Sequence, residues 1–397
     1  ERQADYALLS AVVINVAMLG FFKYADFVVG MINGLIGMDM PLPGISLPIG
    51  ISFFTFQTMS YTIDVYRGEV KAQQNLATFT TFVCLFPQLI AGPIVRYADI
   101  GAELMERHSE IERIGEGLRR FVLGLAKKVL IANALGELTA VFIASPDKSV
   151  LFFWLYAVAF TLQIYFDFSG YSDMAIGLGR VFGFSFPENF NYPYLACSIT
   201  EFWRRWHMTL GSWFRDYVYI PLGGNRQGTG KWLRNIFIVW LLTGLWHGAA
   251  WNFVLWGLLF GVVLTIEKLG LLRFLDKLPT WLRHIYVMFI ILCSFVIFNG
   301  AGIGGACADL GGMFGVGDYP FLSGQTVYYL KSYGLLLILA IIGATPAPRR
   351  WAEKLAACPG GQQGQAVVQP LLLLALLLAV TAYLVDGSFN PFLYFRF

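Results

Sequence analysis

The most constraining feature of this sequence is that long stretches of apolar residues contain no charge at all. Residues 251–266 and 366–385 lack Lys, Arg, Asp and Glu. A helix needs about 20 such residues to cross the hydrocarbon core of a bilayer, and a soluble domain has no interior that hides several of them. Only 13% of the 397 residues are charged, against about 25% in soluble proteins. These features exclude a soluble enzyme, a coiled coil, a disordered chain and a secreted disulfide scaffold.

Continuous apolar runs, rather than alternation with a period of two, favour helices over a membrane β-barrel. We therefore predict an all-α polytopic membrane protein, with a single transmembrane bundle over residues 1–397. Residues 77–95 differ from a simple span, because Phe86-Pro87 and Gly92-Pro93 break a helix twice. They predict a re-entrant or kinked pair of half-helices. The predicted spans are 6–22, 48–65, 118–136, 149–168, 233–247, 251–267, 284–300, 329–344 and 367–385.

The basic residues predict the orientation of the spans. They concentrate in 96–128, 204–234, 268–283 and 349–354, whereas the loop 301–327 has no Lys or Arg. By the positive-inside bias the basic stretches lie in the cytoplasm, which places the C-terminus outside.

The net charge of +3 gives no reason to expect a nucleic-acid partner. The five cysteines have no CxxC spacing and indicate neither a disulfide framework nor a zinc site.

The segment 169–232 has no convincing span, yet it is rich in Trp, Tyr, Phe and Arg. We predict that it forms amphipathic helices and re-entrant loops packed on the cytoplasmic side of the bundle, because such side chains prefer the membrane interface. Loops of this length inside a compact domain are usually functional.

His247 is the strongest candidate for a functional residue. It lies between Trp246 and Gly248, with apolar runs on both sides, and an ionisable residue at such a position is expensive to bury. We expect the chain to turn within the membrane or to break its helix near Gly244 or Gly248. Either would place His247 against a cavity, where a neutral imidazole suits a general base. The alternatives are a core histidine bonded to a backbone carbonyl and an interfacial histidine in an external turn.

His207 is the second candidate, in the aromatic and basic stretch 201–210. At helical spacing Trp203 and His207 would share one face of a helix. The alternative is an interfacial helix with an aromatic belt and snorkelling arginines and no chemistry of its own. The chain has four histidines. The other two, His108 and His284, lie in charged boundary stretches and are interpreted as solvated.

A short polar motif contains two carboxylates, Asp167 and Asp173. They could work as a paired acid and base. Alternatively, Ser169 and Ser172 cap a helix and Asp173 lies in its first turn, which is the interpretation we favour for Asp173. Asp167 lies deeper, and we expect it to be buried beside a partner such as an arginine of 204–215.

Residues 221–231 are rich in glycine and basic residues and could cradle the phosphates of a nucleotide-bearing donor. The favoured alternative is a flexible cytoplasmic turn. Asn225 and Arg226 are the candidate contacts in this loop. The GxxxxGK[ST] order of a P-loop is absent, as are a GxSxG elbow and an HExxH zinc helix.

Several of these segments together resemble the membrane-bound O-acyltransferases, most closely the branch active in alginate O-acetylation. The resemblance covers essentially the whole chain, and it is highly specific for the family but identifies the acceptor poorly. It rests on 86–94 (FPQLIAGPI), 167–173 (DFSGYSD), 189–194 (NFNYPY), 202–207 (FWRRWH), 219–226 (YIPLGGNR), 244–248 (GLWHG) and 390–397 (NPFLYFRF).

The resemblance implies acyl transfer from a cytoplasmic thioester to a hydroxyl, inside a bundle pierced by a central tunnel. The family's buried catalytic histidine matches His247, and its second polar residue matches His207. Acetyl-CoA is the implied donor substrate, with no bound cofactor and no metal. Residues 77–95 and 169–232 would help to build the cytoplasmic funnel. Candidate residues for the tunnel lining or donor contacts are Asp167, Ser169, Trp203, Arg204, Arg205, Trp206, Trp246, Asn252, Asn225 and Arg226.

The resemblance also implies a multi-pass protein of the bacterial inner membrane. Its partners would be an exopolysaccharide and periplasmic proteins that accept the acetyl group, and further spans would precede Glu1. Two alternatives stay open. One is D-alanyl transfer to a teichoic acid from a carrier protein. The other is a transporter or flippase with His247 as a proton relay, although nothing in the sequence suggests paired interrupted spans.

Overall fold

The computed structural model describes residues 2–358, 361–387 and 392–393, and all regular structure in these ranges is helical, without a β-strand. Short π-helical stretches (η1, η3 and η4) interrupt or extend several helices, and η2 is a single 3-10 turn. The elements are α1 (Arg2–Ile36), α2 (Ile51–Arg67), α3 (Leu76–Val83), α4 (Phe86–Leu89), α5 (Tyr97–Met105), α6 (Ile111–Ala126), η1 (Lys127–Ala132), α7 (Asn133–Ala144), α8 (Val150–Val181), η2 (Pro193–Leu195), α9 (Ile199–Trp203), α10 (Met208–Phe214), η3 (Arg215–Tyr219), α11 (Thr229–His247), α12 (Trp251–Ile266), η4 (Glu267–Leu271), α13 (Leu272–Leu275), α14 (Thr280–Asn299), α15 (Gly302–Met313), α16 (Gly324–Gly343), α17 (Ala347–Ala357) and α18 (Gly361–Asp386).

Six helices of the described chain are long and apolar enough to cross a membrane. The remaining predicted spans also lie on helices, although shorter or more polar ones. The prediction of an all-α polytopic membrane fold is therefore confirmed. The six are Arg2–Ile36, Val150–Val181, Trp251–Leu275, Thr280–Asn299, Gly324–Gly343 and Gly361–Asp386.

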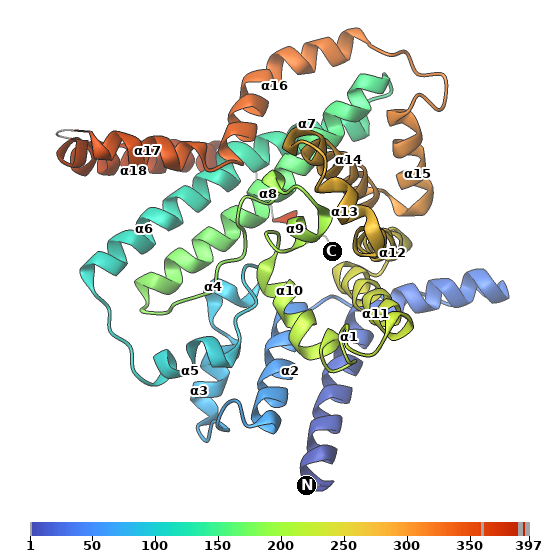
Figure 1. Cartoon of the computed structure of the whole chain (residues 1–397), viewed down its shortest axis with the longest axis vertical. Coiled ribbons are helices and arrows are strands. Elements are labelled where there is room, and N and C mark those ends of the chain that lie inside the picture. The colour runs from blue at the N-terminus through green and yellow to red at the C-terminus, as the bar shows by residue number, and fades with distance from the viewer. Residues whose placement is uncertain (1, 359–360, 388–391, 394–397) are drawn as a thin grey trace.

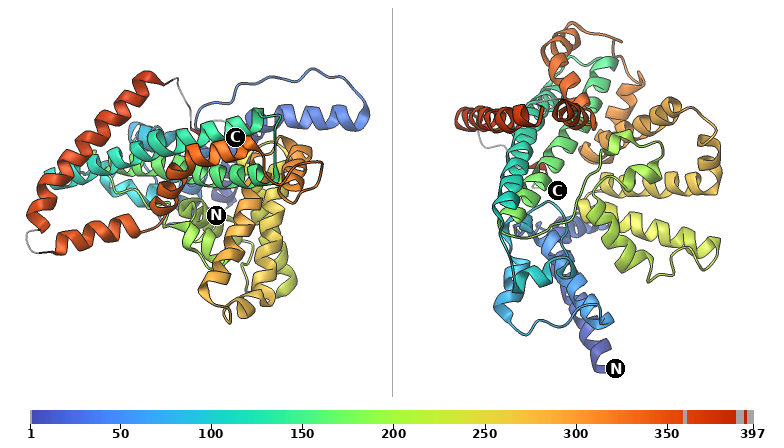
Figure 2. Two further views of the ribbon diagram at one scale, coloured as in Figure 1. Left: turned by 90° about the horizontal axis from the view of Figure 1, so that it is seen from above. Right: turned by 60° about the vertical axis from the view of Figure 1, so that its left-hand side comes forward.

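Helix α8 forms the centre of the bundle. In its most apolar stretch 78% of the residues are buried, whereas none are buried in that of α1 and 6% in that of α18. Figure 1 shows α8 in the interior and α17 and α18 reaching outward, and the two views in Figure 2 agree. The peripheral helices therefore expose apolar side chains of the kind that contact lipid, while α8 packs against protein on nearly every side.

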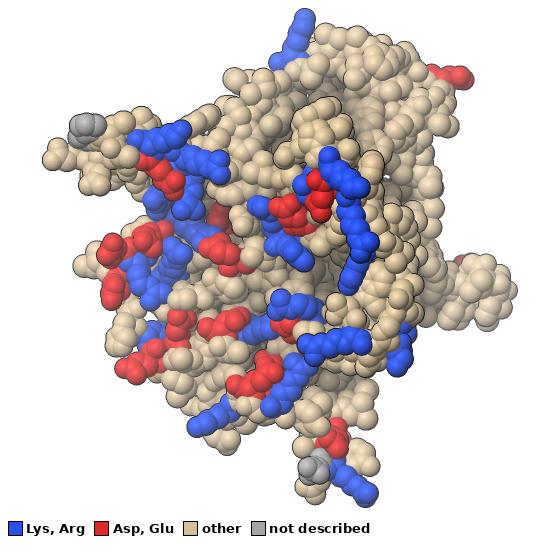
Figure 3. Space-filling model, in the orientation of Figure 1, with Lys and Arg blue, Asp and Glu red and all other residues tan. Residues whose placement is uncertain are grey.

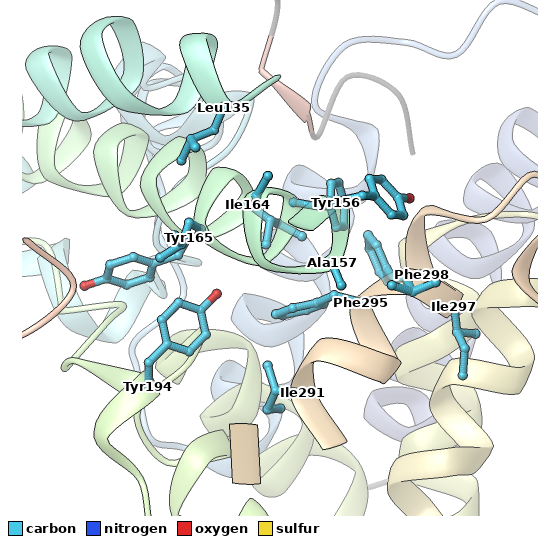
Figure 4. Close-up of a cluster of buried hydrophobic side chains, with 14 of the residues drawn as sticks. Leu135, Tyr156, Ala157, Ile164, Tyr165, Tyr194, Ile291, Phe295, Ile297 and Phe298 are labelled. Atoms are coloured by element: carbon cyan, nitrogen blue, oxygen red, sulfur yellow. The ribbon is translucent and has the colours of Figure 1, made fainter. Parts of the chain in front are cut away.

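The largest hydrophobic core lies where α7, α8, η2 and α14 meet (Figure 4). Leu135 of α7, Tyr165 of α8 and Phe295 of α14 are all buried there. Tyr194 of η2 joins them, and its hydroxyl donates a hydrogen bond to the carbonyl of Thr161 on α8. This core fixes the irregular segment around η2 against the central helix.

Glycines let the backbones of α6 and α8 approach closely. A Cβ built on Gly117 would lie 2.5 Å from the carbonyl oxygen of Gly177, and one built on Gly124 would lie 2.6 Å from that of Gly170. Small residues at such crossings allow close packing inside a membrane, where the hydrophobic effect does not drive helices together. The pairing of α6 with α8 thus depends on these four positions.

Helix α8 extends well beyond its predicted end. It continues through Ser169 and Ser172 to Val181, so the irregular segment begins only after Val181 and not at residue 169. The capping interpretation of Ser169, Ser172 and Asp173 is wrong, because all three lie in the middle of a helix. The small residues here form the contact face for α6 rather than a helix end, as the close approach at Gly170 shows.

The two carboxylates of α8 form ion pairs with α6 and η1. Asp173 contacts Arg120 at 2.8 Å and Lys127 at 2.6 Å. Asp167 accepts a hydrogen bond from the Nζ of Lys128, and both side chains are buried. The expected arginine partner of Asp167 is therefore wrong. The lysine comes from the π-helical turn η1, which directly follows the α6 face packed on α8.

The helix break predicted within 77–95 is confirmed. Helix α3 ends at Val83, and α4 begins at Phe86 with Pro87 in its first turn, where a missing N–H costs nothing. Gly92 follows with a φ of +104°, and a Cβ there would lie 3.3 Å from the ring of Tyr171 on α8. Glycine is favoured at this position because the backbone angle is strained for other residues and a Cβ would make a tight contact with the Tyr171 ring.

Charged side chains gather in one region of the face drawn in Figure 3. Figure 3 shows Lys, Arg, Asp and Glu spread over the region of α5, α6, α10 and α17, with broad uncharged surfaces beside it. Many of these charges are paired, such as Arg96 with Asp216 at 2.9 Å and Arg205 with Glu201 at 2.8 Å. Placing this face in the cytoplasm stays a prediction from the positive-inside bias.

The α6–α8 contact predicts opposite outcomes for two glycines of the same helix. In Gly124→Ala the new methyl group would meet the backbone of Gly170, so we expect a lower unfolding temperature in detergent. Gly115→Ala is the matched control, because a Cβ there has nothing within 4 Å and alanine favours a helix over glycine by up to about 1 kcal/mol. Equal unfolding temperatures for the two variants, measured by fluorescence-detected thermal unfolding, would contradict this account.

Candidate active site

His247 is the last residue of α11, and the helix breaks directly after it. Gly248 is extended, and α12 begins at Trp251. The two helices pack closely as a hairpin, since a Cβ on Gly244 would lie 2.4 Å from the carbonyl oxygen of Phe253. The expected break near Gly248 is confirmed, and it places a buried histidine at the tip of the α11–α12 hairpin.

Aromatic rings surround the imidazole of His247, which is only 5% exposed. Its ring centroid lies 5.0 Å from that of Trp246, 5.1 Å from that of Trp256 and 5.3 Å from that of Phe298. An apolar environment disfavours the charged imidazolium. The surroundings therefore favour a neutral ring, which is the form able to accept a proton.

Two side chains of α1 bind the carbonyl groups at the end of α11. The Nζ of Lys23 donates to the carbonyl of Trp246 and, at 3.3 Å, to that of His247. The hydroxyl of Tyr24 donates to the carbonyl of Leu245. The last carbonyls of a helix lack intrahelical partners, and a cation there also interacts favourably with the helix dipole. Lys23 and Tyr24 thus stabilise the backbone that holds His247.

Sequence reasoning missed Lys23. It directly follows the predicted span 6–22 and so lies outside the stretch that the apolar pattern predicts. The structure places it within the 35-residue helix α1, so it is an ionisable residue inside an apolar span, which is the same feature that identified His247.

His207 lies in the connection between α9 and α10, in the left-handed region with φ 44° and ψ 54°. It is 2% exposed, and its Nδ1 lies 3.0 Å from the Oδ1 of Asn189. Its ring centroid is 4.7 Å from that of Phe168. Backbone conformations of this kind cost energy in residues other than glycine and are concentrated at functional sites.

The structure brings the two candidate histidines together. The ring of His207 lies 6.0 Å from that of Trp246, and the ring of Trp246 lies 5.0 Å from that of His247. The two histidines are also close enough to interact electrostatically. Both predicted residues therefore belong to a single buried site, with Trp246 as a shared wall.

A cavity of about 110 Å³ reaches this site. His247, Trp246 and Lys23 line it. Ile90 and residues 47–53, where the α1–α2 connection enters α2, complete its lining. A small hydroxyl-bearing group fits a space of this size next to the imidazole of His247.

A polar cluster lies at the opposite end of α2. Tyr217 donates to both carboxylate oxygens of buried Asp64 at 2.8 Å, and Arg96 lies over the Tyr217 ring. Burial raises the pKa of Asp216, but hydrogen bonds from Arg215 and Arg96 and their charges outweigh it and hold the pKa below its usual range. Asp64 lies 13 residues after the cavity residue Ile51 on α2, which separates the two by about 20 Å along the helix.

The other residues predicted from 201–210 take structural positions. Helix α9 ends at Trp203, so the expected helical face shared by Trp203 and His207 does not exist. Trp203 packs on Trp240 and Phe260 at 4.7 and 4.8 Å. Trp206 is buried in the core. The arginines point elsewhere, Arg204 being exposed and Arg205 being paired with Glu201.

The five other predicted contacts divide into near and distant ones. Asp167 and Ser169 are buried on α8 on either side of Phe168, which contacts His207, and Asp167 also accepts from the backbone N–H of Leu393 at 2.8 Å. Asn252 is buried at the start of α12 and donates to the carbonyl of Phe298 at 3.0 Å. Asn225 and Arg226 are exposed beyond the opposite end of α11. That helix has 19 residues, which separates them from His247 by about 27 Å.

No three His, Cys, Asp or Glu side chains of the described ranges gather as metal ligands. Most of the terminal motif 390–397 lies outside the described residues, as do residues 359–360 and Glu1. The site as described thus consists of His207 and His247, the aromatic wall and the cavity.

The family model for membrane-bound O-acyltransferases matches residues 51–303. The chain belongs to the membrane-bound O-acyltransferase family. The matched range contains both histidines, the cavity residues of α2 and the whole of α8 through α14. This O-acyltransferase therefore has its two candidate histidines inside the range that the family model matches.

Curated relatives in several bacteria support the same family. A probable alginate O-acetylase of Azotobacter vinelandii is 41% identical over all of this chain and 86% of the relative. The peptidoglycan O-acetyltransferase of Helicobacter pylori is 35% identical over 78% of this chain and 64% of its own length. A teichoic acid D-alanyltransferase of Bacillus subtilis is 30% identical over 55% of this chain and 58% of its own length.

The α1–α11 contact predicts that this O-acyltransferase depends on Lys23. Lys23→Met removes the donors to the Trp246 and His247 carbonyls, and a buried carbonyl left without a partner costs about 1–3 kcal/mol. We expect kcat for acyl transfer to fall by up to about 100-fold, because misplacing a reacting group by about 1 Å can cost that much. Lys23→Arg retains a cation and hydrogen-bond donors and should keep most of the activity. Equal kcat values for the two variants in proteoliposomes would refute a role for Lys23.

Proposed function

We propose that this O-acyltransferase takes an acetyl group from acetyl-CoA at the cytoplasmic face and passes it to a hydroxyl on the other side of the membrane. The product would be an O-acetylated exopolysaccharide, alginate or a similar polymer, formed directly or through a periplasmic partner protein. The acetyl group is supported by relatives named for O-acetylation, one of which matches the whole chain at 41% identity. The D-alanyltransferase of Bacillus subtilis matches only 55% of the chain.

The observation that supports this proposal most strongly is the position of His247. It is buried beside a cavity lined by Ile51 of α2, and Asp64, which binds Tyr217 in the charged cluster around Arg96, lies about 20 Å farther along the same helix. A donor with a charged nucleotide suits the charged end, and a hydroxyl acceptor suits the cavity. Because the two substrates would enter from opposite faces, neither needs to cross the membrane whole.

The proposed chemistry is a single acyl transfer. His247 takes the proton of the incoming hydroxyl, whose oxygen attacks the carbonyl carbon of the thioester. The C–O bond forms, the C–S bond breaks, and the thiolate leaves and is protonated from His247. His207 orients one of the substrates or stabilises the developing oxyanion. The aromatic wall around His247 excludes water, which limits hydrolysis of the thioester.

The same proposal assigns the protein a cellular location and interaction partners. It would be a multi-pass protein of the bacterial inner membrane, with the basic face in the cytoplasm and the C-terminus in the periplasm. Acetyl-CoA is its cytoplasmic substrate. Its external partners are the exopolysaccharide and any periplasmic protein that accepts the acetyl group before the polymer does.

The proposal predicts a large loss of activity in His247→Ala. Removing a general base costs about 10²–10⁴-fold in rate, so transfer of labelled acetyl from acetyl-CoA to external acceptors should become barely detectable. Mass spectrometry of polysaccharide and co-expressed periplasmic proteins measures it. His108→Ala is the matched control, because this histidine side chain is 82% exposed in a boundary loop, and it should retain activity.

Three results would contradict the proposal. Undiminished acetylation by a stably inserted His247→Ala protein would remove His247 from the reaction. Transfer from a D-alanyl-loaded carrier protein, with none from acetyl-CoA, would favour the teichoic-acid alternative. Loss of polymer export while acetyl transfer continues in vitro would favour a transporter.

A further inference from the structure

Asn189 connects three elements around His207. This residue is completely buried in the extended chain between α8 and η2. Its Nδ2 donates to the carbonyl of Gly92 at 3.3 Å and to the hydroxyl of Ser172 at 3.1 Å. Its Oδ1 accepts from the hydroxyl of Thr209 at 2.9 Å and from the Thr209 backbone N–H at 3.4 Å. The same oxygen lies 3.0 Å from the Nδ1 of His207.

Backbone groups fix the orientation of the Asn189 amide. The N–H of Thr209 only donates and the carbonyl of Gly92 only accepts, so a rotated amide would place donor against donor at one end and acceptor against acceptor at the other. The backbone N–H of Ile94 donates to the Thr209 hydroxyl oxygen at 3.0 Å, which leaves the hydroxyl proton of Thr209 to point at Asn189. The atom facing His207 is therefore the carbonyl oxygen.

The backbone of His207 is held against Asn189 as well. The N–H of Met208 donates to the main-chain carbonyl of Asn189, and the N–H of Asn191 donates to that of Arg205, both at 2.9 Å. These bonds pair the two chain segments on either side of the site. They hold His207 in its left-handed conformation and keep its Nδ1 opposite the Oδ1 of Asn189.

We propose that Asn189 is a positioning residue that fixes the tautomer of His207, with the proton on Nδ1 and the lone pair on Nε2. A carbonyl oxygen 3.0 Å from Nδ1 requires a proton between the two atoms. In a neutral imidazole the other nitrogen then only accepts. In the acyl transfer proposed above, on which this step rests, neutral His207 accepts a hydrogen bond or a proton at Nε2 and does not stabilise the oxyanion by donating from it.

The tautomer is directly measurable by solid-state ¹⁵N NMR of the full-length protein in lipid, labelled in its histidines. The chain has four histidines, so loss of one set of resonances in His207→Gln assigns the residue. We expect a protonated Nδ1 and a non-protonated Nε2 for His207 in the wild-type protein. A proton on Nε2 alone would overturn the proposal, whatever the protein is found to catalyse.

Variants of Asn189 test the cause of the tautomer. Asn189→Ala removes the acceptor, and we expect a population of the Nε2–H form to appear. Asn189→Asp keeps an oxygen opposite Nδ1, and as a buried carboxylic acid it can donate from its second oxygen toward the Gly92 carbonyl, so it should preserve the Nδ1–H form. Ser172→Ala is the matched control, since it removes a contact of the Asn189 Nδ2 but leaves Oδ1 in place. An unchanged His207 spectrum in a folded Asn189→Ala protein would overturn the role of Asn189.

Kinetics separate positioning from stability. We expect Asn189→Ala to lower kcat for acetyl transfer about tenfold to 100-fold with little change in KM for acetyl-CoA, and Asn189→Asp to recover most of it. Equal loss in both variants despite wild-type unfolding temperatures would contradict the positioning role. Absence of acetyl transfer even in the wild-type protein would count against the proposed function alone, because the NMR result stands without it.

Discussion

The end of α11 inside the protein is the constraint on which the site depends. A helix that stops within a bundle leaves carbonyl groups without partners, and in a membrane no bulk water can bind them. Lys23 and Tyr24 of α1 supply the missing donors. The hairpin after His247 is possible because Gly244 lets α12 approach the backbone of α11. A buried imidazole at a helix end is thus a consequence of three separate contacts.

His207 is also held by hydrogen bonds to backbone and side-chain groups, but these come from other segments. The chain around His207 is irregular, and its polar groups are satisfied by Asn189 and Thr209 and by backbone groups near Gly92. Helix α8 packs against this region, since its Phe168 contacts the His207 ring. Glycine contacts keep α8 close to α6. The central helix therefore fixes the position of His207 relative to Trp246 and His247.

Much of the fold was predictable because a bilayer requires long apolar helices, and such runs are visible without any knowledge of contacts. The same reasoning predicted His247, because an ionisable imidazole is unusual within an apolar stretch. The helix end predicted at residues 169–173 is wrong, since Ser, Gly and Asp are typical of helix ends but here form the face of α8 that packs on α6. Lys23 and Asn189 contact the site across 223 and 18 residues of sequence. No local pattern encodes contacts of that kind.

The central claim is that His207 and His247 act as one unit on one acyl group. The most direct test compares acetyl transfer from labelled acetyl-CoA by His207→Ala, His247→Ala and the double variant in the same membranes. Residues that act together in one step are strongly non-additive. We predict that the double variant loses no more activity than the more damaged single variant. Losses that multiply would show that the two histidines act independently and would contradict the account.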